Sequence, residues 1–285
     1  MDSPRQVISH YSIKPRKSLG QSFLIERSII ENIATTANIT KEDVVVEIGS
    51  GIGVLTEKLA ENAAKLIAVE LDNRLVEVLK EKFFKYENVQ ICSGDILKFD
   101  FRTITVDQQH KMKVVGNIPY NISSPLLFHL FSFRKIISSF VLMLQKEVVQ
   151  RLVAHPGSKN YGVPSVILQM FTDLEKVMDV PAVCFYPRPK VDSSVIKGCF
   201  FENPKIELLD EEFFIKLVRE SFSQRRKTLI NNLKKSKLLE GVAEFVLKET
   251  LVYAGIDPQR RGETLSFEEF GNLSNVLNNK IKEQF

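Results

Sequence analysis

Cysteine is scarce in this sequence and forms no pattern that would give it a structural role. The 285 residues include three cysteines, Cys92, Cys184 and Cys199. Because their number is odd and no C-x-x-C pair occurs, a disulfide framework and a cysteine-based zinc site are both disfavoured. Such residues are typical of reduced, small apolar side chains in a protein of the cytoplasm.

Long apolar runs are absent as well. No run in the sequence approaches the ~20 residues that a membrane-spanning helix needs. The basic residues near the start, among them Arg5, Lys14 and Arg16, are not followed by an apolar stretch, which argues against a secretory signal. We therefore expect a protein of the cytoplasm that makes no membrane contact.

The sequence also lacks a strong excess of one charge. Its formal net charge is +4 at pH 7, which by itself is too small to indicate a nucleic-acid-binding protein. Hydrophobic residues make up 44% and charged residues 26%, as in ordinary globular proteins, so disorder and fibrous repeats are disfavoured. The length of the chain suits one large domain joined to a small one.

Short apolar strands alternate with helices between residues 44 and 153. Strands are predicted at 44–48, 65–70, 89–92, 113–116 and 140–144, and helices at 27–37, 54–61, 74–84 and 146–153. This alternation predicts an α/β fold, in which helices cover both faces of a parallel sheet. Residues 1–20 are polar and basic, and we expect them to form an extended arm.

A different pattern begins near residue 176. Strands at 176–180 and 195–201 flank a proline-rich loop and are expected to close the sheet as an antiparallel hairpin. Asn203 and Pro204 then mark a boundary. The predicted domains are therefore 1–203 and 204–285.

The second predicted domain is small and mostly helical. Asp210 is a typical helix N-cap, and two glutamates follow it in the first helical turn. Ser266 and Glu269 have the spacing of a capping box and predict a last helix.

A glycine-rich turn follows the first strand of the alternating region. Gly49 and Gly51 lie where the strand meets a helix, so a ligand can approach the bare main chain there, although a packing turn is the alternative. Glu70 ends the next strand, 21 residues after Gly49, at the spacing where an acid reaches ribose hydroxyls. Asp95 follows the third strand and can accept a hydrogen bond from an adenine amino group.

The spacing of this turn is G-x-G-x-G and lacks the third glycine of dinucleotide-binding folds. A nicotinamide oxidoreductase is therefore disfavoured. The pattern favours a nucleoside ligand without a diphosphate, such as S-adenosylmethionine.

The segment 117–120 (NIPY) has the features of the reacting end of the site, which is the part that would hold the methyl acceptor. The side-chain oxygen of Asn117 and the carbonyl of Ile118 are two neighbouring acceptors, which suit the two hydrogens of an exocyclic amino group. They can hold the nitrogen with its lone pair aimed at a methyl donor, while Tyr120 stacks on the base. We therefore predict methylation of an amino nitrogen.

The sequence resembles the KsgA family, the small-subunit ribosomal RNA adenine dimethyltransferases. The matching stretches are 17–24 (KSLGQSFL), 46–51 (VEIGSG), 69–72 (VELD), 94–95 (GD), 116–121 (GNIPYN), 185–193 (FYPRPKVDS) and 222–229 (FSQRRKTL). They occur in order and extend over nearly the whole chain.

The resemblance implies a Rossmann-like class I methyltransferase domain, with a seven-stranded, mostly parallel sheet, and a helical C-terminal domain. It implies that two adjacent adenines near the 3′ end of the small-subunit RNA become dimethyladenosine during ribosome biogenesis. Cofactor contacts are implied at Ser22, Leu24, Gly49, Glu70, Asp95 and Asn117. Phe185 is implied to face Tyr120 across the target adenine, although a core phenylalanine is the alternative.

One residue departs from the family pattern. Where family members usually have Asn or His, this chain has Ser22. Because serine is shorter, its contact with the methionine carboxylate is expected to pass through a water molecule.

A local cluster of positive charge predicts the RNA contact. Residues 219–237 contain seven basic residues and one acid. Phosphate-binding roles are predicted for Arg225, Arg226, Lys227, Lys234 and Lys235, and a solvated helix face is the alternative. The expected partners are small-subunit ribosomal RNA and the immature small ribosomal subunit, bound by a monomer.

Other functions remain open on the same motifs. A related enzyme that methylates large-subunit RNA and confers macrolide resistance is the nearest alternative, and the RRK segment favours the small subunit. A DNA adenine methyltransferase more often carries D-P-P-Y, which is absent. A non-enzymatic assembly or transcription factor on this fold is disfavoured because Asn117 and Tyr120 are intact.

Overall fold

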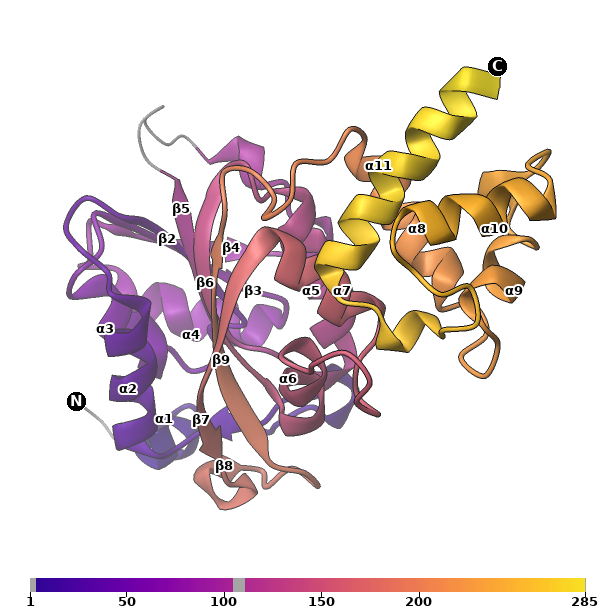
Figure 1. Ribbon diagram of the computed structural model, residues 1–285. Helices are drawn as coiled ribbons and strands as arrows, with labels where there is room; N and C mark the ends of the chain where they lie inside the picture. The colour runs from indigo at the N-terminus through magenta and orange to yellow at the C-terminus, as the bar shows by residue number, and fades with distance from the viewer. Residues whose placement is uncertain (1–3, 105–110, 285) are drawn as a thin grey trace. The chain divides into compact units, whose positions relative to one another are not determined.

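A seven-stranded sheet organises the first part of the protein, whose computed structural model describes residues 4–104 and 111–284 (Figure 1). The strand order is β4-β3-β2-β5-β6-β9-β7. The bounds are β2 Val44–Ile48, β3 Lys65–Glu70, β4 Val89–Ser93, β5 Met112–Asn117, β6 Ile137–Gln145, β7 Thr172–Val180 and β9 Ser193–Phe200. Strands β2 to β6 pair in parallel and β9 runs antiparallel to β6, so the predicted mostly parallel sheet is confirmed.

Helices cover both faces of this sheet. Helices α2 (Arg27–Ala37) and α3 (Val54–Ala60) lie on one face, and α5 (Ser123–Ser132) lies on the other (Figure 1). Ile33 of α2 is fully buried in a core cluster with side chains of β2, β3, β5, β6 and β9. Strands buried on both faces are apolar along their whole length, which is why β2 could be read from the sequence.

The strand order places a crevice at one edge of the sheet. From β2 the chain continues outward through β3 and β4, whereas β5 and β6 extend in the opposite direction. Open α/β sheets bind ligands at this reversal, beside the carboxyl ends of the strands. Glu70 and Asn117 are the last residues of β3 and β5 and therefore meet there.

The expectation of an extended arm at residues 1–20 is wrong for residues 4–20, and residues 1–3 lie outside the described part of the chain. Residues Pro4–His10 form helix α1, and Lys17–Leu19 form a 3-10 turn. Val7 is 3% exposed and packs in a small cluster with Phe23, Ile52 and Leu75. Arg5, Gln6, Ser9 and His10 of α1 are exposed, and only Val7 and the partly buried Ile8 are known to pack in this cluster, so the polar composition suggested an arm.

A separate sheet of two short strands joins distant parts of the chain. Strand β1 (Phe23–Leu24) pairs antiparallel with β8 (Phe185–Tyr186), so that Phe23 lies opposite Tyr186. The N-terminal segment and the proline-rich loop therefore meet at the same edge of the sheet.

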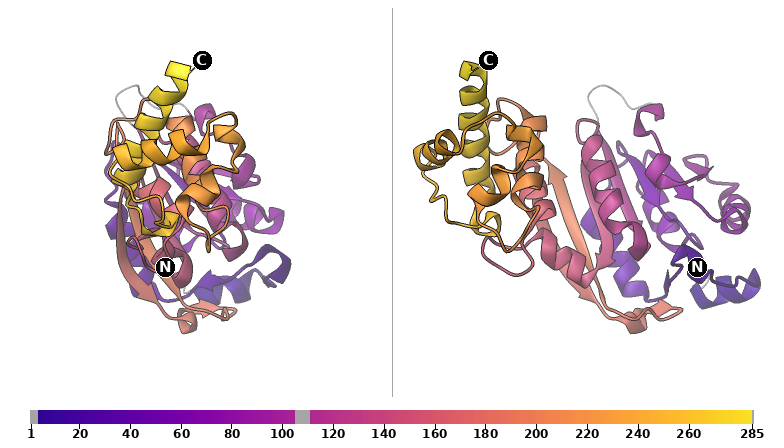
Figure 2. Two further views of the ribbon diagram at one scale, coloured as in Figure 1. Left: turned by 45° about the vertical axis from the view of Figure 1, so that its right-hand side comes forward. Right: turned by 90° about the vertical axis from the view of Figure 1, so that its right-hand side faces the viewer.

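The C-terminal part is helical, as Figures 1 and 2 show. Its helices are α8 (Glu211–Ser221), α9 (Leu229–Leu233), α10 (Glu244–Tyr253) and α11 (Phe267–Gln284). Asp210 accepts a hydrogen bond from the Phe213 N–H at 2.9 Å, and Glu269 accepts one from the Ser266 N–H at 2.8 Å, so both predicted caps are confirmed. Across residues 4–104 and 111–284, no helix has the length and apolar character to cross a membrane.

The chain forms two compact units whose limits differ from the predicted domains at residues 201–203 and in one longer segment, 150–174. The first unit is Met1–Val149 with Glu175–Phe200, and the second is Gln150–Leu174 with Phe201–Phe285. The segment includes helix α7 (Val163–Phe171), which the sequence did not predict. Phe171 packs against Phe214 of α8 with ring centroids 6.2 Å apart, so α7 belongs to the core of the second unit.

We predict that Val7→Ala lowers the free energy of unfolding by about 1.5 kcal/mol, because two buried carbons are lost. Arg5→Ala changes the exposed face of the same helix and should alter stability by less than about 0.5 kcal/mol. Urea denaturation of both variants measures the difference, and equal stability would mean that α1 does not pack on the first unit.

Candidate active site

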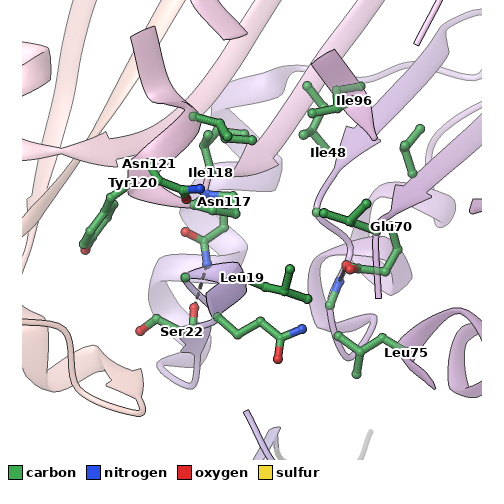
Figure 3. Close-up of a pocket in the computed structure, with 18 of the residues that line it drawn as sticks. Leu19, Ser22, Ile48, Glu70, Leu75, Ile96, Asn117, Ile118, Tyr120 and Asn121 are labelled. Carbon is green, nitrogen blue, oxygen red and sulfur yellow. Dashed lines mark hydrogen bonds between the residues drawn. The ribbon is translucent and has the colours of Figure 1, made fainter. Parts of the chain in front are cut away.

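A cavity of about 310 Å³ occupies the crevice at the carboxyl ends of the strands (Figure 3). All predicted catalytic and cofactor-binding residues except Leu24 line it: Ser22, Gly49, Gly51, Glu70, Asp95, Asn117, Ile118, Tyr120 and Phe185. Leu24 is 5% exposed, and its side chain lies in the core cluster beneath the cavity. The structure therefore brings together residues that are up to 163 positions apart, from Ser22 to Phe185.

The glycine loop is held in a conformation that favours glycine. Gly49 has a φ of 68° and Gly51 a φ of 57°, both in the left-handed region. A Cβ at Gly51 would lie 3.3 Å from the ring of Phe23. The loop therefore presents bare main chain to the cavity.

Glu70 supports this loop from the end of β3. One carboxylate oxygen accepts from the Gly51 N–H at 2.9 Å, and the other accepts from the Asp72 N–H at 2.8 Å. Glu70 is 7% exposed, and burial raises its pKa while these two backbone donors oppose the rise. Each oxygen keeps acceptor capacity, so the carboxylate can also receive hydroxyl hydrogens of a sugar.

Asp95 lies at the end of β4, beside open space. Its side chain accepts from the Leu97 N–H at 3.0 Å and caps the short turn Ile96–Lys98. No atom lies within 4 Å of a Cβ built on the preceding Gly94. Ile48 and Ile96 provide apolar walls (Figure 3), so this end of the cavity suits a flat base with polar edges.

Asn117 lies at the opposite end of the cavity, where β5 stops. Its Nδ2 donates to the Ser22 carbonyl at 3.1 Å (Figure 3), and the next residue, Ile118, donates its N–H to the Met143 carbonyl at 3.1 Å. The first bond fixes the amide group, because only Nδ2 can donate to a carbonyl. The Asn117 Oδ1 is thereby kept as an acceptor.

Two aromatic residues, Tyr120 and Phe185, line the same cavity as Asn117. The Tyr120 hydroxyl shares a hydrogen bond with Ser193 Oγ at 2.8 Å, which holds the ring. Burial raises the pKa of Tyr120, so the phenol stays neutral. Phe185 is 4% exposed and lines the cavity from β8 while packing in the core cluster.

Ser22 is oriented by the proline-rich loop. Its hydroxyl donates to the Pro187 carbonyl at 2.7 Å. The hydroxyl hydrogen is used in that bond, which leaves the Ser22 oxygen to accept from a ligand or a water molecule. The predicted water-bridged contact with a carboxylate stays a prediction.

Sequence reasoning missed a charged residue directly beneath the glycine loop. Glu47 of β2 is 1% exposed and accepts from Thr56 Oγ1 at 2.5 Å. Burial raises its pKa to about 7. The sequence carried a signal for this residue. Glu47 is a carboxyl group inside an otherwise apolar strand and lies two residues before Gly49.

The predicted RNA-binding cations lie in the second unit and differ in their surroundings. All five are exposed, but Arg225 pairs with Glu263 and donates to the Lys159 carbonyl, and Lys234 pairs with Glu244 at 3.3 Å. Within the described parts of the chain, Arg226, Lys227 and Lys235 have no ion-pair partner. The loop between α8 and α9 carries Arg225, Arg226 and Lys227, so the cluster is not one helical face.

Residues 12–279 match the family described as ribosomal RNA adenine dimethylase. The chain belongs to the ribosomal RNA adenine dimethylase family. The chain is 44% identical to a protein of Bacillus mycoides, over 96% of this chain and 94% of the relative, and 43% identical to one of Syntrophus aciditrophicus, over 96% and 98%. Both relatives are named ribosomal RNA small subunit methyltransferase A, and the family expected from the motifs is confirmed.

Solved structures agree with this assignment. A dimethyladenosine transferase from Plasmodium falciparum superposes with a TM-score of 0.78 at 30% identity, covering 90% of this chain and 97% of that chain. The 23S rRNA methyltransferase ErmE superposes with a TM-score of 0.69 at 25% identity, covering 90% and 99%. The predicted class I methyltransferase fold, with a helical C-terminal region, is thus confirmed.

The raised pKa of Glu47 makes the stability of the protein depend on pH. Its pKa is about 7 in the folded protein and 4.5 as an ordinary glutamate, so protonation favours the folded state. This contribution is complete below pH 4.5 and is lost as the pH rises to about 7. Relative to Glu47→Gln, the wild-type free energy of unfolding should fall by about 3 kcal/mol across that interval.

Urea denaturation of both proteins at a series of pH values measures this difference. Groups that titrate alike in both proteins cancel in the comparison. Parallel pH profiles would show that Glu47 ionises without cost in the folded protein.

Proposed function

We propose that this protein transfers methyl groups from S-adenosylmethionine to the amino nitrogens of two adjacent adenines near the 3′ end of small-subunit ribosomal RNA. The observation that supports it most is the fixed acceptor of Asn117, in one cavity with two aromatic residues and with Glu70 and Asp95. The names of the two relatives favour the small subunit as the source of the RNA.

The residues of the cavity fit S-adenosylmethionine. Gly49 and Gly51 leave room for close approach, and the acceptors of Glu70 and Asp95 match ribose hydroxyls and an adenine amino group. Ser22 and Asn117 lie at the other end, where the methionine part would be held. When bound, the cofactor supplies an electrophilic methyl group.

The chain's own residues orient the nucleophile. Asn117 Oδ1 and the Ile118 carbonyl accept the two hydrogens of the adenine amino group, which turns the nitrogen lone pair toward the donor. The ring lies between Tyr120 and Phe185, and stacking on aromatic side chains holds an extruded base. The nitrogen loses a proton readily once it carries positive charge, so no strong base is required.

The same acceptors explain two rounds of methylation. After the first transfer the nitrogen keeps one hydrogen, and one acceptor still has a partner. If the pocket has room for the first methyl group, the second transfer follows the same geometry. The proposed product is therefore dimethyladenosine.

The second unit is proposed to bind the RNA. Arg226, Lys227 and Lys235 are exposed cations, and phosphate neutralisation dominates nucleic-acid affinity. The immature small subunit is the proposed partner, bound by a monomer. A cytoplasmic location stays a prediction of the sequence.

We predict that Asn117→Ala lowers the methylation rate by roughly 100-fold or more, because it removes an acceptor that acts mainly in the transition state. Transfer of labelled methyl groups to immature small subunits measures the rate, with large subunits as the comparison. Cofactor affinity, measured by calorimetry, should fall much less.

Mass spectrometry of the digested RNA identifies the product. Dimethyladenosine on small-subunit RNA supports the proposal. Methylation of large subunits instead, of another base or of a ring nitrogen would overturn it, as would an Asn117→Ala variant with wild-type turnover.

We predict that the double substitution Arg226→Gln and Lys227→Gln reduces the salt dependence of RNA binding. Each lost phosphate contact should lower the slope of log affinity against log salt by roughly 0.7–0.9. Cofactor binding should be unchanged. The measurement is a salt titration with the RNA hairpin.

The matched control removes two other cations of the second unit. Lys216 and Lys248 are exposed on α8 and α10, so replacing both by Gln changes the net charge equally. If both double variants lowered the salt slope equally, the effect would come from net charge, and no specific phosphate contact could be assigned to Arg226 and Lys227.

A further inference from the structure

A segment of the N-terminal region closes one side of the cofactor cavity. This segment, Arg16–Ser22, is called the strap here. Its residues 18–22 all line the cavity, and Figure 3 shows Leu19 and Ser22 beside it. A Cβ built on Gly20 would lie 3.2 Å from Asn121 Oδ1, so the strap passes close to the turn that follows Asn117.

One end of the strap is fastened to Asp72. The Arg16 N–H donates to Gln21 Oε1 at 2.7 Å, and Gln21 Nε2 donates to Asp72 Oδ2 at 3.0 Å. The Arg16 guanidinium also pairs with Asp72 at 3.6 Å. Asp72 is not among the residues that line the cavity, so its contacts with the strap do not depend on a ligand there.

Asp72 is a suitable fixed point for these contacts. Its side chain is completely buried and accepts from Arg74 through Nη2 at 2.6 Å and Nε at 3.1 Å. Hydrogen bonds from Arg74 lower the pKa of Asp72 to about 2, so the carboxylate is charged at neutral pH. The Asp72 N–H donates to Glu70, which connects the strap to the residue proposed to bind the ribose.

The other end of the strap is held by Ser22. The Ser22 carbonyl accepts from Asn117 Nδ2, and its hydroxyl donates to the Pro187 carbonyl. The strap therefore spans the cavity from the strand end that carries Glu70 to the strand end that carries Asn117.

We propose that Asp72 is a positioning residue that closes the strap over the bound cofactor and thereby sets the cofactor affinity without contacting the cofactor. The identity of the cofactor rests on the proposed function. A closed strap also excludes water from the reacting end of the cavity.

The chain contains a matched control for Asp72. Asp100 accepts from Arg102 in the same Asp-x-Arg arrangement, through the backbone N–H at 3.0 Å, Nε at 2.9 Å and Nη2 at 2.9 Å. Asp72 accepts from the Arg74 N–H at 3.2 Å in the same way. Asp100 lies away from the cavity lining, so Asp100→Asn removes the same local contacts and leaves the strap intact.

Calorimetric titration with S-adenosylmethionine is the first test. Asp72→Asn should weaken binding by about 10- to 100-fold, the scale of hydrogen bonds to charged groups, while Asp100→Asn should bind like wild type. In steady-state assays, KM for the cofactor should rise while kcat changes little, because Ser22 still holds Asn117. A wild-type protein that does not bind S-adenosylmethionine overturns the proposed function; equal binding by all three proteins overturns the role of Asp72 alone.

Trypsin cleavage of the cofactor-free protein is the second test, and it does not depend on the ligand. Arg16 and Lys17 are exposed cleavage sites at the start of the strap. Cleavage there should be about 10-fold faster in Asp72→Asn and in Gln21→Leu than in wild type or Asp100→Asn, in proportion to the opened fraction. Equal cleavage rates in all four proteins would show that Asp72 does not fasten the strap, even if Asp72→Asn folds less stably.

Discussion

The carboxylate of Glu70 holds together the segments that meet at the cofactor cavity. Its two oxygens accept from Gly51 in the glycine loop and from Asp72 at the start of α4 (Asn73–Phe83), while its backbone carbonyl accepts from Gly94. A buried charge is tolerated only with such partners, so the three loops must keep their positions for the fold to be stable. The cavity therefore has its shape before any ligand enters. Ligand binding does not have to order these loops, so their conformational entropy does not reduce the binding free energy.

Much of this architecture could be predicted from the sequence. Strands β2 and β3 have the predicted bounds, because buried parallel strands are continuous apolar runs that end at glycine or at a charged residue. The residues of the site could be predicted for a related reason. The carboxyl ends of parallel strands converge, so Gly49, Glu70, Asp95 and Asn117 had to meet once the strand order was assumed.

The remainder depends on contacts between residues far apart in the chain. Gln21 and Asp72 are separated by 51 positions, and the local sequence around either residue does not predict the hydrogen bond between them. Arg225 was expected to contact phosphate, yet it pairs with Glu263, 38 residues later. Helix α7 escaped prediction because a short, nearly continuous apolar segment is compatible with either a strand or a helix until its packing partners are known.

The bond from Asn117 to the Ser22 carbonyl has a consequence for the choice of base. An amide side chain that was free to turn could offer either its oxygen or its nitrogen to a ligand, and would accept a keto group as readily as an amino group. Ser22 removes that freedom, since a carbonyl faces only the nitrogen end. In the proposed reaction, a guanine or hypoxanthine would bring its O6 against the Asn117 oxygen, lone pair against lone pair. Discrimination between purines would thus originate in a main-chain carbonyl of the N-terminal segment, far in sequence from the strand that carries the reacting asparagine.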